Sequence, residues 1–220
     1  MDEEDIIEDI KNLDALLEGH FVFTSGRHGN AYVNKDLIST EPPLLADLAE
    51  ESYEQIKDLV DQGQIQVVAC AAVGAIPFAV LLARRCVVLF AYAEPFKGEL
   101  SEGLGPVFAF YRGFDQVVRG KKVLVAEDII TTGGTVEAVK KAVEELGGEV
   151  VGISCIWLRG ENTFTVPLEA LVTKQFPSWS AQECLPCRNG IPISIEVGHG
   201  REFLQEFGEN PANWPANRRK

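Results

Sequence analysis

The segment from Val123 to Val136 constrains the fold more than any other part of the sequence. It reads Val-Leu-Val-Ala-Glu-Asp-Ile-Ile-Thr-Thr-Gly-Gly-Thr-Val. The four apolar residues 123–126 predict a strand that is buried on both faces, which is typical of a parallel sheet covered by helices. Glu127 and Asp128 would then emerge at the carboxyl end of this strand, the edge at which open α/β sheets bind ligands.

A turn rich in hydroxyl groups and glycine follows the two acids and leads into a predicted helix over residues 134–146. Backbone N–H groups, threonine hydroxyls and a helix N-terminus together suit a phosphate monoester. Adjacent carboxylates suit vicinal hydroxyls or a hydrated cation, so the segment predicts a site for a sugar phosphate. The phosphate would meet Thr131, Thr132, Gly133, Gly134 and Thr135. The simpler alternative is a strand-to-helix turn with a threonine N-cap and no ligand.

Strand patterns alternate with helical patterns along the rest of the chain. Apolar residues at helical spacing predict three further helices, over residues 3–18, 43–61 and 75–85. Short apolar runs predict strands over residues 65–70, 87–91, 107–111, 123–126, 150–157 and 170–173. This order predicts an α/β fold with a mostly parallel central sheet flanked by helices.

Length and charge limit the domain count and the kinds of partner. The 220 residues fit one domain, with a helix and hairpin in 1–40, a core in 62–175 and a C-terminal tail, 176–220, that packs on the core. A net charge of −13 argues against electrostatic binding to nucleic acid or to anionic membranes. No stretch of 18 uncharged apolar residues occurs, and the acidic N-terminus differs from a basic signal peptide. We therefore expect a cytoplasmic protein.

The segment 123–135 resembles the phosphoribosyl diphosphate (PRPP) signature of the type I phosphoribosyltransferases. That signature is an apolar run, then Glu-Asp, two more residues and Thr-Thr-Gly-Gly-Ser/Thr, and the match is complete. The resemblance implies the type I phosphoribosyltransferase fold, with a small N-terminal hood. It also implies that Glu127 and Asp128 hold the ribose 2- and 3-hydroxyls, while the turn 131–135 holds the 5-phosphate. Mg²⁺ would be carried by PRPP and lie near Asp128, with no metal ligand set of the protein's own.

A second loop matches the pyrophosphate end of the same family. Ala72, Val73 and Gly74 form a small-residue turn between a predicted strand and a predicted helix, and could present backbone N–H groups to the diphosphate. The resemblance implies a non-proline cis peptide in this loop. A tight strand-to-helix connection without a ligand is the alternative.

The run from Gly19 to Lys35 resembles the opening of the orotate phosphoribosyltransferases, in which a hairpin after the first helix covers the base. Tyr32 could stack on a planar pyrimidine, and Lys35 could balance its carboxylate. Arg159 ends a predicted strand, where that group has an arginine that pairs bidentately with the carboxylate of the base. The alternatives are an ordinary exposed hairpin and a solvated arginine.

The predicted acceptor is therefore orotate, and the resemblance implies a homodimer. Two other functions remain open: phosphoribosyl transfer to another purine or pyrimidine, and a non-catalytic regulator of the same fold that senses PRPP or nucleotides.

The segment that many orotate enzymes use to stabilise the leaving pyrophosphate differs here. It carries one lysine and three acids over residues 94–103, where those enzymes have several lysines and a histidine. Tyr111-Arg112-Gly113-Phe114 resembles an alternative arginine-bearing turn. Lys97 and Arg112 are thus the candidate catalytic cations, with ordinary surface charge as the alternative for each.

The five cysteines are an odd number without the density of a disulfide framework, so we expect reduced thiols. Cys184 and Cys187 form a C-x-x-C, but zinc normally takes four ligands and the sequence has no second C-x-x-C or histidine pair, which argues against a metal site. By resemblance, such a pair followed by Gly-Ile-Pro has a structural role. The three histidines have no metal-ligand spacing, and we expect turn or surface positions for His20, His28 and His199.

Overall fold

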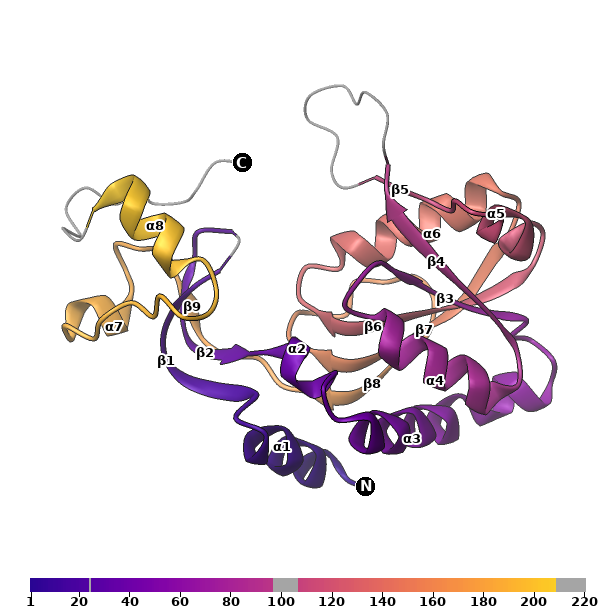
Figure 1. Ribbon diagram of the computed structural model, residues 1–220, viewed down its shortest axis with the longest axis horizontal. Helices are drawn as coiled ribbons and strands as arrows, with labels where there is room; N and C mark the ends of the chain where they lie inside the picture. The colour runs from indigo at the N-terminus through magenta and orange to yellow at the C-terminus, as the bar shows by residue number, and fades with distance from the viewer. Residues whose placement is uncertain (24, 97–106, 209–220) are drawn as a thin grey trace. The chain divides into compact units, whose positions relative to one another are not determined.

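The computed structural model describes residues 1–23, 25–96 and 107–208 (Figure 1). Within it the chain folds into two compact units. The larger unit, called the core unit below, comprises residues 1–6 and 38–174; the smaller unit comprises residues 7–37 and 175–220. Each unit is described by itself.

A six-stranded sheet forms the centre of the core unit. Its strand order is β5-β4-β3-β6-β7-β8, and every neighbouring pair is parallel except β4 and β5. All five residues of β3 are buried, as expected for a central strand covered on both faces. The predicted α/β fold with a mostly parallel sheet is confirmed. The strands are β3 Val67–Ala71, β4 Leu89–Pro95, β5 Phe108–Ala109, β6 Lys122–Ile130, β7 Glu149–Leu158 and β8 Leu168–Thr173.

Helices cover both faces of this sheet (Figure 1). The helices α3 (Pro42–Asp61) and α4 (Ile76–Cys86) pack on one face, and α6 (Gly134–Glu145) packs on the other, with the short α5 (Phe114–Val118) beside β4. Residues of α6 and alternate residues of β3 and β6 share one buried apolar cluster, because side chains of a strand alternate between its faces. None of the helices within the described residues is long and apolar enough to cross a membrane.

The smaller unit is built around a three-stranded antiparallel sheet of order β1-β2-β9. The predicted hairpin is present: Phe23 N–H donates to Arg27 O, and the Arg27 guanidinium donates to Ser178 O and Oγ. A few apolar side chains, centred on Phe203, form its core. Its strands are β1 Leu16–Val22, β2 His28–Val33 and β9 Ser178–Trp179, followed by the helices α7 Leu185–Arg188 and α8 Gly200–Phe207. The helices α1 (Glu3–Asn12) and α2 (Lys35–Ile38) cross the unit boundaries.

Two sequence-based expectations differ from this arrangement. The helix predicted over residues 3–18 ends at Asn12; the chain turns through Asp14, at φ 52°, and Leu16 begins a strand instead. His20 and His28 are buried, at 2% and 0% exposure, so their predicted turn or surface positions are wrong. The described part of the tail 176–220 groups with the hairpin through β9 and helices α7 and α8, and the expected packing of this tail on the core stays a prediction.

Candidate functional site

The two acids lie within β6, which continues to Ile130 rather than ending before them. Glu127 and Asp128 are 7% and 6% exposed. Main-chain groups fix both carboxylates, since Asp128 N–H donates to Glu127 Oε1 at 3.1 Å and Ile129 N–H donates to Asp128 Oδ1 at 2.6 Å. The acid pair is therefore held in place near the carboxyl end of the strand. The sequence predicted this position, but it placed the two acids after the strand, whereas they lie within it.

Two thiols flank the acid pair on the neighbouring strands. Cys155 lies opposite Glu127 in the β6–β7 register, and Cys70 is the fourth residue of β3. Burial first, and the charges of Glu127 and Asp128 second, raise the pKa of both thiols well above the usual range. The thiols are thus neutral and add no charge beside the acid pair.

The predicted phosphate loop lies directly after β6. Thr131 and Thr132 are exposed, and Gly133 adopts a left-handed conformation at φ 76° as the N-cap of α6. No side chain of the described residues caps this N-terminus. The first N–H groups of a helix have no partner within the helix, so Gly134, Thr135 and Val136 can direct N–H groups at an anion here.

The segment after β7 packs against the phosphate loop. Arg159 N–H donates to Ile130 O at 2.8 Å. A Cβ on Gly160 would lie 1.8 Å from Thr131 O, so only glycine fits at that position without a backbone shift. The structure thereby brings the half-buried Arg159 to the start of the phosphate loop. Sequence reasoning missed Gly160, because its close contact depends on the β6–β7 register.

The predicted pyrophosphate loop lies next to the acid pair in the sheet. β3 and β6 are parallel neighbours, with Ala69 opposite Val125, so the loop 72–74 and the loop 131–133 leave the same sheet edge. The helices that follow, α4 and α6, cover opposite faces, which makes this position the switch point where open sheets bind ligands. The expected non-proline cis peptide is present between Ala72 and Val73.

One of the two candidate cations lies near the pyrophosphate loop. Ala72 N–H donates to Ala93 O, and the next residue, Glu94, accepts a hydrogen bond from Arg112 Nε at 2.8 Å. Arg112 is exposed and adopts φ 58°. Its charge is thus paired with Glu94 at the edge of the site. The other candidate, Lys97, lies outside the described residues.

The remaining predicted base-binding residues belong to the smaller unit. Tyr32 packs its ring against that of Phe21, with centroids 5.6 Å apart, and the half-buried Lys35 begins α2. Arg159 belongs to the core unit. The base-binding role of these three residues stays a prediction.

A cavity of about 200 Å³ lies elsewhere in the core unit. It is lined by residues of α3 and the middle of the sheet, among them Ile56, Leu59 and Gly152. This position is under a covering helix, whereas the acid pair and both loops lie at the carboxyl edge of the sheet. The cavity is therefore separate from the candidate site.

Comparisons with known proteins agree with this geometry. A family model described as phosphoribosyl transferase domain matches residues 36–185. An orotate phosphoribosyltransferase of Caldanaerobacter subterraneus subsp. tengcongensis is 34% identical over 195 residues, which are 88% of this chain and 96% of that relative.

Solved structures share the fold. The crystal structure of orotate phosphoribosyltransferase from Aeropyrum pernix has a TM-score of 0.59 at 23% identity, and covers 76% of this chain and 93% of that one. The adenine phosphoribosyltransferase of Rhodothermus marinus has a TM-score of 0.56 at 21% identity, and covers 77% of this chain and 99% of that one. The region matched by the family model contains the acid pair, both loops and Arg159. The chain therefore belongs to the phosphoribosyl transferase family.

Proposed function

We propose that this protein transfers the phosphoribosyl group of PRPP to orotate, giving orotidine 5′-monophosphate and pyrophosphate. The observation that carries the proposal is the meeting of three parts at one sheet edge: the buried acid pair, the loop at the N-terminus of α6, and the loop 72–74 on the neighbouring strand. The choice of orotate is supported by the curated relative of that name, which matches over most of both chains.

Each part has a distinct task in the reaction. The turn 131–135 binds the 5-phosphate, and the carboxylates of Glu127 and Asp128 accept hydrogen bonds from the ribose 2- and 3-hydroxyls. With the ribose fixed, a ring nitrogen of the base forms a bond to C1 of the ribose as the C1–O bond to the diphosphate breaks. The electron pair of that bond leaves with pyrophosphate, and the proton of the ring nitrogen passes to the departing pyrophosphate or to water. Backbone N–H groups of Ala72–Gly74 and a nearby cation stabilise the charge that develops on the leaving group.

Mg²⁺ fits the chemistry of this edge, because hard cations prefer oxygen ligands and the acid pair supplies carboxylate oxygens. We expect Mg²⁺ to arrive with PRPP and to lie near Asp128, since it usually keeps waters and substrate phosphates among its ligands. When bound, it neutralises charge on the diphosphate oxygens. A cytoplasmic location and a homodimer remain predictions from the sequence.

Arg159 is the proposed contact for the carboxylate of orotate. Arg159 follows β7, and its backbone N–H is bonded to Ile130 O, directly before the phosphate loop. A planar guanidinium can meet a carboxylate with two hydrogen bonds. Tyr32 and Lys35 are proposed to stack on the ring and to balance its charge. Arg112, once released from Glu94, is the proposed cation for pyrophosphate, with Lys97 as the second candidate.

A direct test mixes the protein with PRPP, Mg²⁺ and a panel of bases, and follows release of pyrophosphate. Release with orotate and not with adenine, hypoxanthine or uracil supports the proposal. Release with another base would reassign the acceptor, and binding of PRPP without release with any base would indicate the regulator.

The catalytic part of the proposal is tested by the double variant Glu127→Gln, Asp128→Asn. We expect kcat to fall by about 100-fold or more, because one contact that stabilises the transition state is typically worth 10²–10³ in rate. The matched control is Glu145→Gln, which removes a carboxylate at the exposed end of α6 and should leave kcat unchanged. Wild-type turnover in a folded double variant would remove the acid pair from the mechanism.

A further inference from the structure

Four metal-ligating side chains converge in the smaller unit. One ring nitrogen each of His20 and His28 and the sulfurs of Cys184 and Cys187 all lie within 4.8 Å of one another. His20 Nε2 lies 2.8 Å from His28 Nδ1 and 3.4 Å from each sulfur, and Cys187 Sγ lies 3.3 Å from His28 Nδ1. The C-x-x-C thus has a histidine pair beside it, although the spacing of the histidines in the sequence indicated none.

These separations are close to the edges of a zinc tetrahedron. Zinc bonds of about 2.0–2.1 Å to nitrogen and 2.3 Å to sulfur place tetrahedral ligands about 3.3 Å apart for two nitrogens and about 3.5 Å apart for nitrogen and sulfur. The observed distances are shorter by at most a few tenths of an ångström for the nitrogen–sulfur pairs and by about half an ångström for the nitrogen pair. Four of the six ligand pairs thus lie within about half an ångström of zinc geometry, and all six lie within 4.8 Å.

The hydrogen bond of His20 orients the ring for metal binding. His20 Nδ1 lies 2.7 Å from the carbonyl oxygen of Ile191. A carbonyl oxygen can only accept, so Nδ1 carries the proton and Nε2 of the neutral ring directs a lone pair at the two sulfurs. Metal-binding histidines characteristically donate their second ring N–H to a backbone carbonyl in this way.

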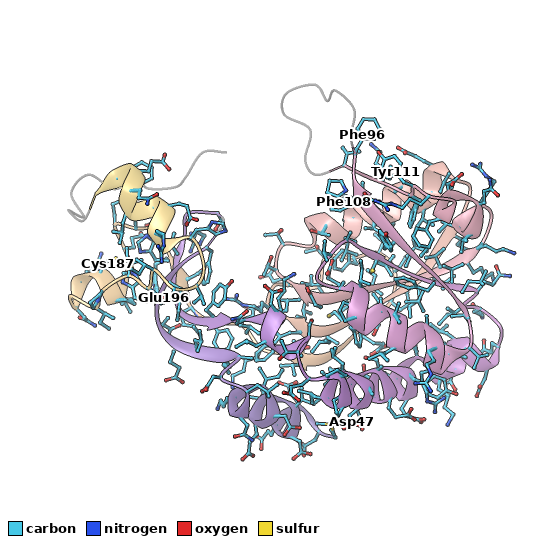
Figure 2. The ribbon with its side chains drawn as sticks, viewed as in Figure 1. Asp47, Phe96, Phe108, Tyr111, Cys187 and Glu196 are labelled. Atoms are coloured by element: carbon cyan, nitrogen blue, oxygen red, sulfur yellow. The ribbon has the colours of Figure 1, made fainter. Side chains whose placement is uncertain are left out.

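The secondary structure supplies the four ligands from two separate segments. His20 and His28 lie on the paired strands β1 and β2. Cys184 is the N-cap of α7, and Cys187 lies within this helix (Figure 2). Arg188 N–H donates to Cys184 O and closes the turn between the two cysteines. A site here would join the hairpin to a segment more than 150 residues further along the chain. No other group of three or more metal-ligating side chains converges in this way within the described residues.

The smaller unit has physical reason to need such a link. Among the described residues, the buried members of the apolar cluster around Phe203 are Val22, Ala181 and Phe203 itself. A cluster this small contributes little stability, and disulfides or structural metals often supplement small cores. The rings of Phe203 and His28 meet nearly at right angles, with centroids 5.0 Å apart, so this ligand packs directly on the cluster.

We propose that His20, His28, Cys184 and Cys187 bind one Zn²⁺ that joins the β1–β2 hairpin to the C-terminal segment. Two thiolates and two imidazoles in a tetrahedral arrangement are a ligand set that selects zinc. All four positions are filled by the protein, so the ion is structural and takes no part in phosphoribosyl transfer. The proposal is independent of the base that the enzyme uses.

The test is metal analysis of the full-length protein, purified without a histidine tag. Inductively coupled plasma mass spectrometry should find one zinc per chain. After chelation and refilling with Co²⁺, visible spectra should show the intense bands of tetrahedral cobalt with thiolate ligands. Zinc content should fall at least tenfold in Cys187→Ala, whereas Cys86→Ala, which removes a buried cysteine of the core unit, should retain it.

Several outcomes would overturn the proposal. One is that the protein takes up no zinc when zinc is supplied. Another is a cobalt spectrum typical of octahedral coordination. A third is a Cys184–Cys187 disulfide in freshly purified protein, detected as a mass two units lower. Full zinc retention in a Cys184→Ala, Cys187→Ala double variant would also overturn the proposal. If that variant does not fold, the cobalt spectrum of the wild-type protein still decides the question.

Discussion

Gly133 and Gly147 stand at opposite ends of α6, and both adopt left-handed backbone conformations, at φ 76° and φ 73°. Their surroundings differ. A Cβ on Gly147 would meet nothing within 4 Å, whereas a Cβ on Gly133 would lie 2.7 Å from Phe164 Cζ. Alanine should therefore strain the backbone by about 1–2 kcal/mol at either end, but only Gly133→Ala should also displace the phosphate loop.

We predict that Gly133→Ala lowers kcat/KM for PRPP by about tenfold or more, since small misplacements of binding groups have large effects on rate. Gly147→Ala should lower thermal stability to a similar extent and leave kcat/KM within about twofold. Steady-state kinetics and thermal unfolding of the two variants make the comparison. Equal losses of kcat/KM in both would mean that the loop conformation is not what binds the phosphate.

The strand pair β6–β7 determines where Arg159 lies. The register Ile130 opposite Leu158 continues into the hydrogen bond from Arg159 N–H to Ile130 O. We predict that Arg159→Gln raises KM for orotate by at least about tenfold, which corresponds to about 1.4 kcal/mol, with a much smaller change in KM for PRPP. The loss follows from replacing a charged bidentate contact by a neutral one.

The matched control is Arg119→Gln, because Arg119 is an exposed arginine of the same unit with a long ion pair to Asp115 at 4.0 Å. Its KM for orotate should not change. A comparable rise in both variants would point to a general effect of charge. No rise in Arg159→Gln would mean that another residue binds the carboxylate.

Elements with local signals were predictable from the sequence, and those that depend on distant pairing were not. The apolar stripe of α3 and the Glu-Asp-Ile-Ile-Thr-Thr-Gly-Gly segment each carry their own pattern, and both were located correctly. Leu16 and Leu17 fit a helical stripe as well as a strand, and only their partners Val33 and Tyr32 decide for β1. The contact of Gly160 with the phosphate loop likewise has no local signal, since it requires the β6–β7 register.

At the scale of the whole molecule, the chain crosses between the two units three times, after residues 6, 37 and 174. The residues assigned to PRPP belong to the core unit, and Tyr32, Lys35 and the four proposed zinc ligands belong to the smaller unit. Spacing rules gave no indication of the four proposed zinc ligands, because Cys184 and His20 are 164 positions apart. Their convergence is a property of the folded smaller unit and cannot be read from either segment alone.

If the two units have separate cores, a cavity in one core should destabilise that unit and leave the other unit unchanged. Phe203 is 0% exposed in the smaller unit, and Phe78 is 1% exposed in α4 of the core unit, so the two alanine variants make the same chemical change in different cores. Each should lose about 3–5 kcal/mol of local stability. Hydrogen exchange should rise in β1, β2 and α8 for Phe203→Ala, and in β3, β4 and α4 for Phe78→Ala, because local opening follows cooperative units. Equal increases across both units in either variant would show that they unfold as one, and the structural division into two units would then have no energetic counterpart.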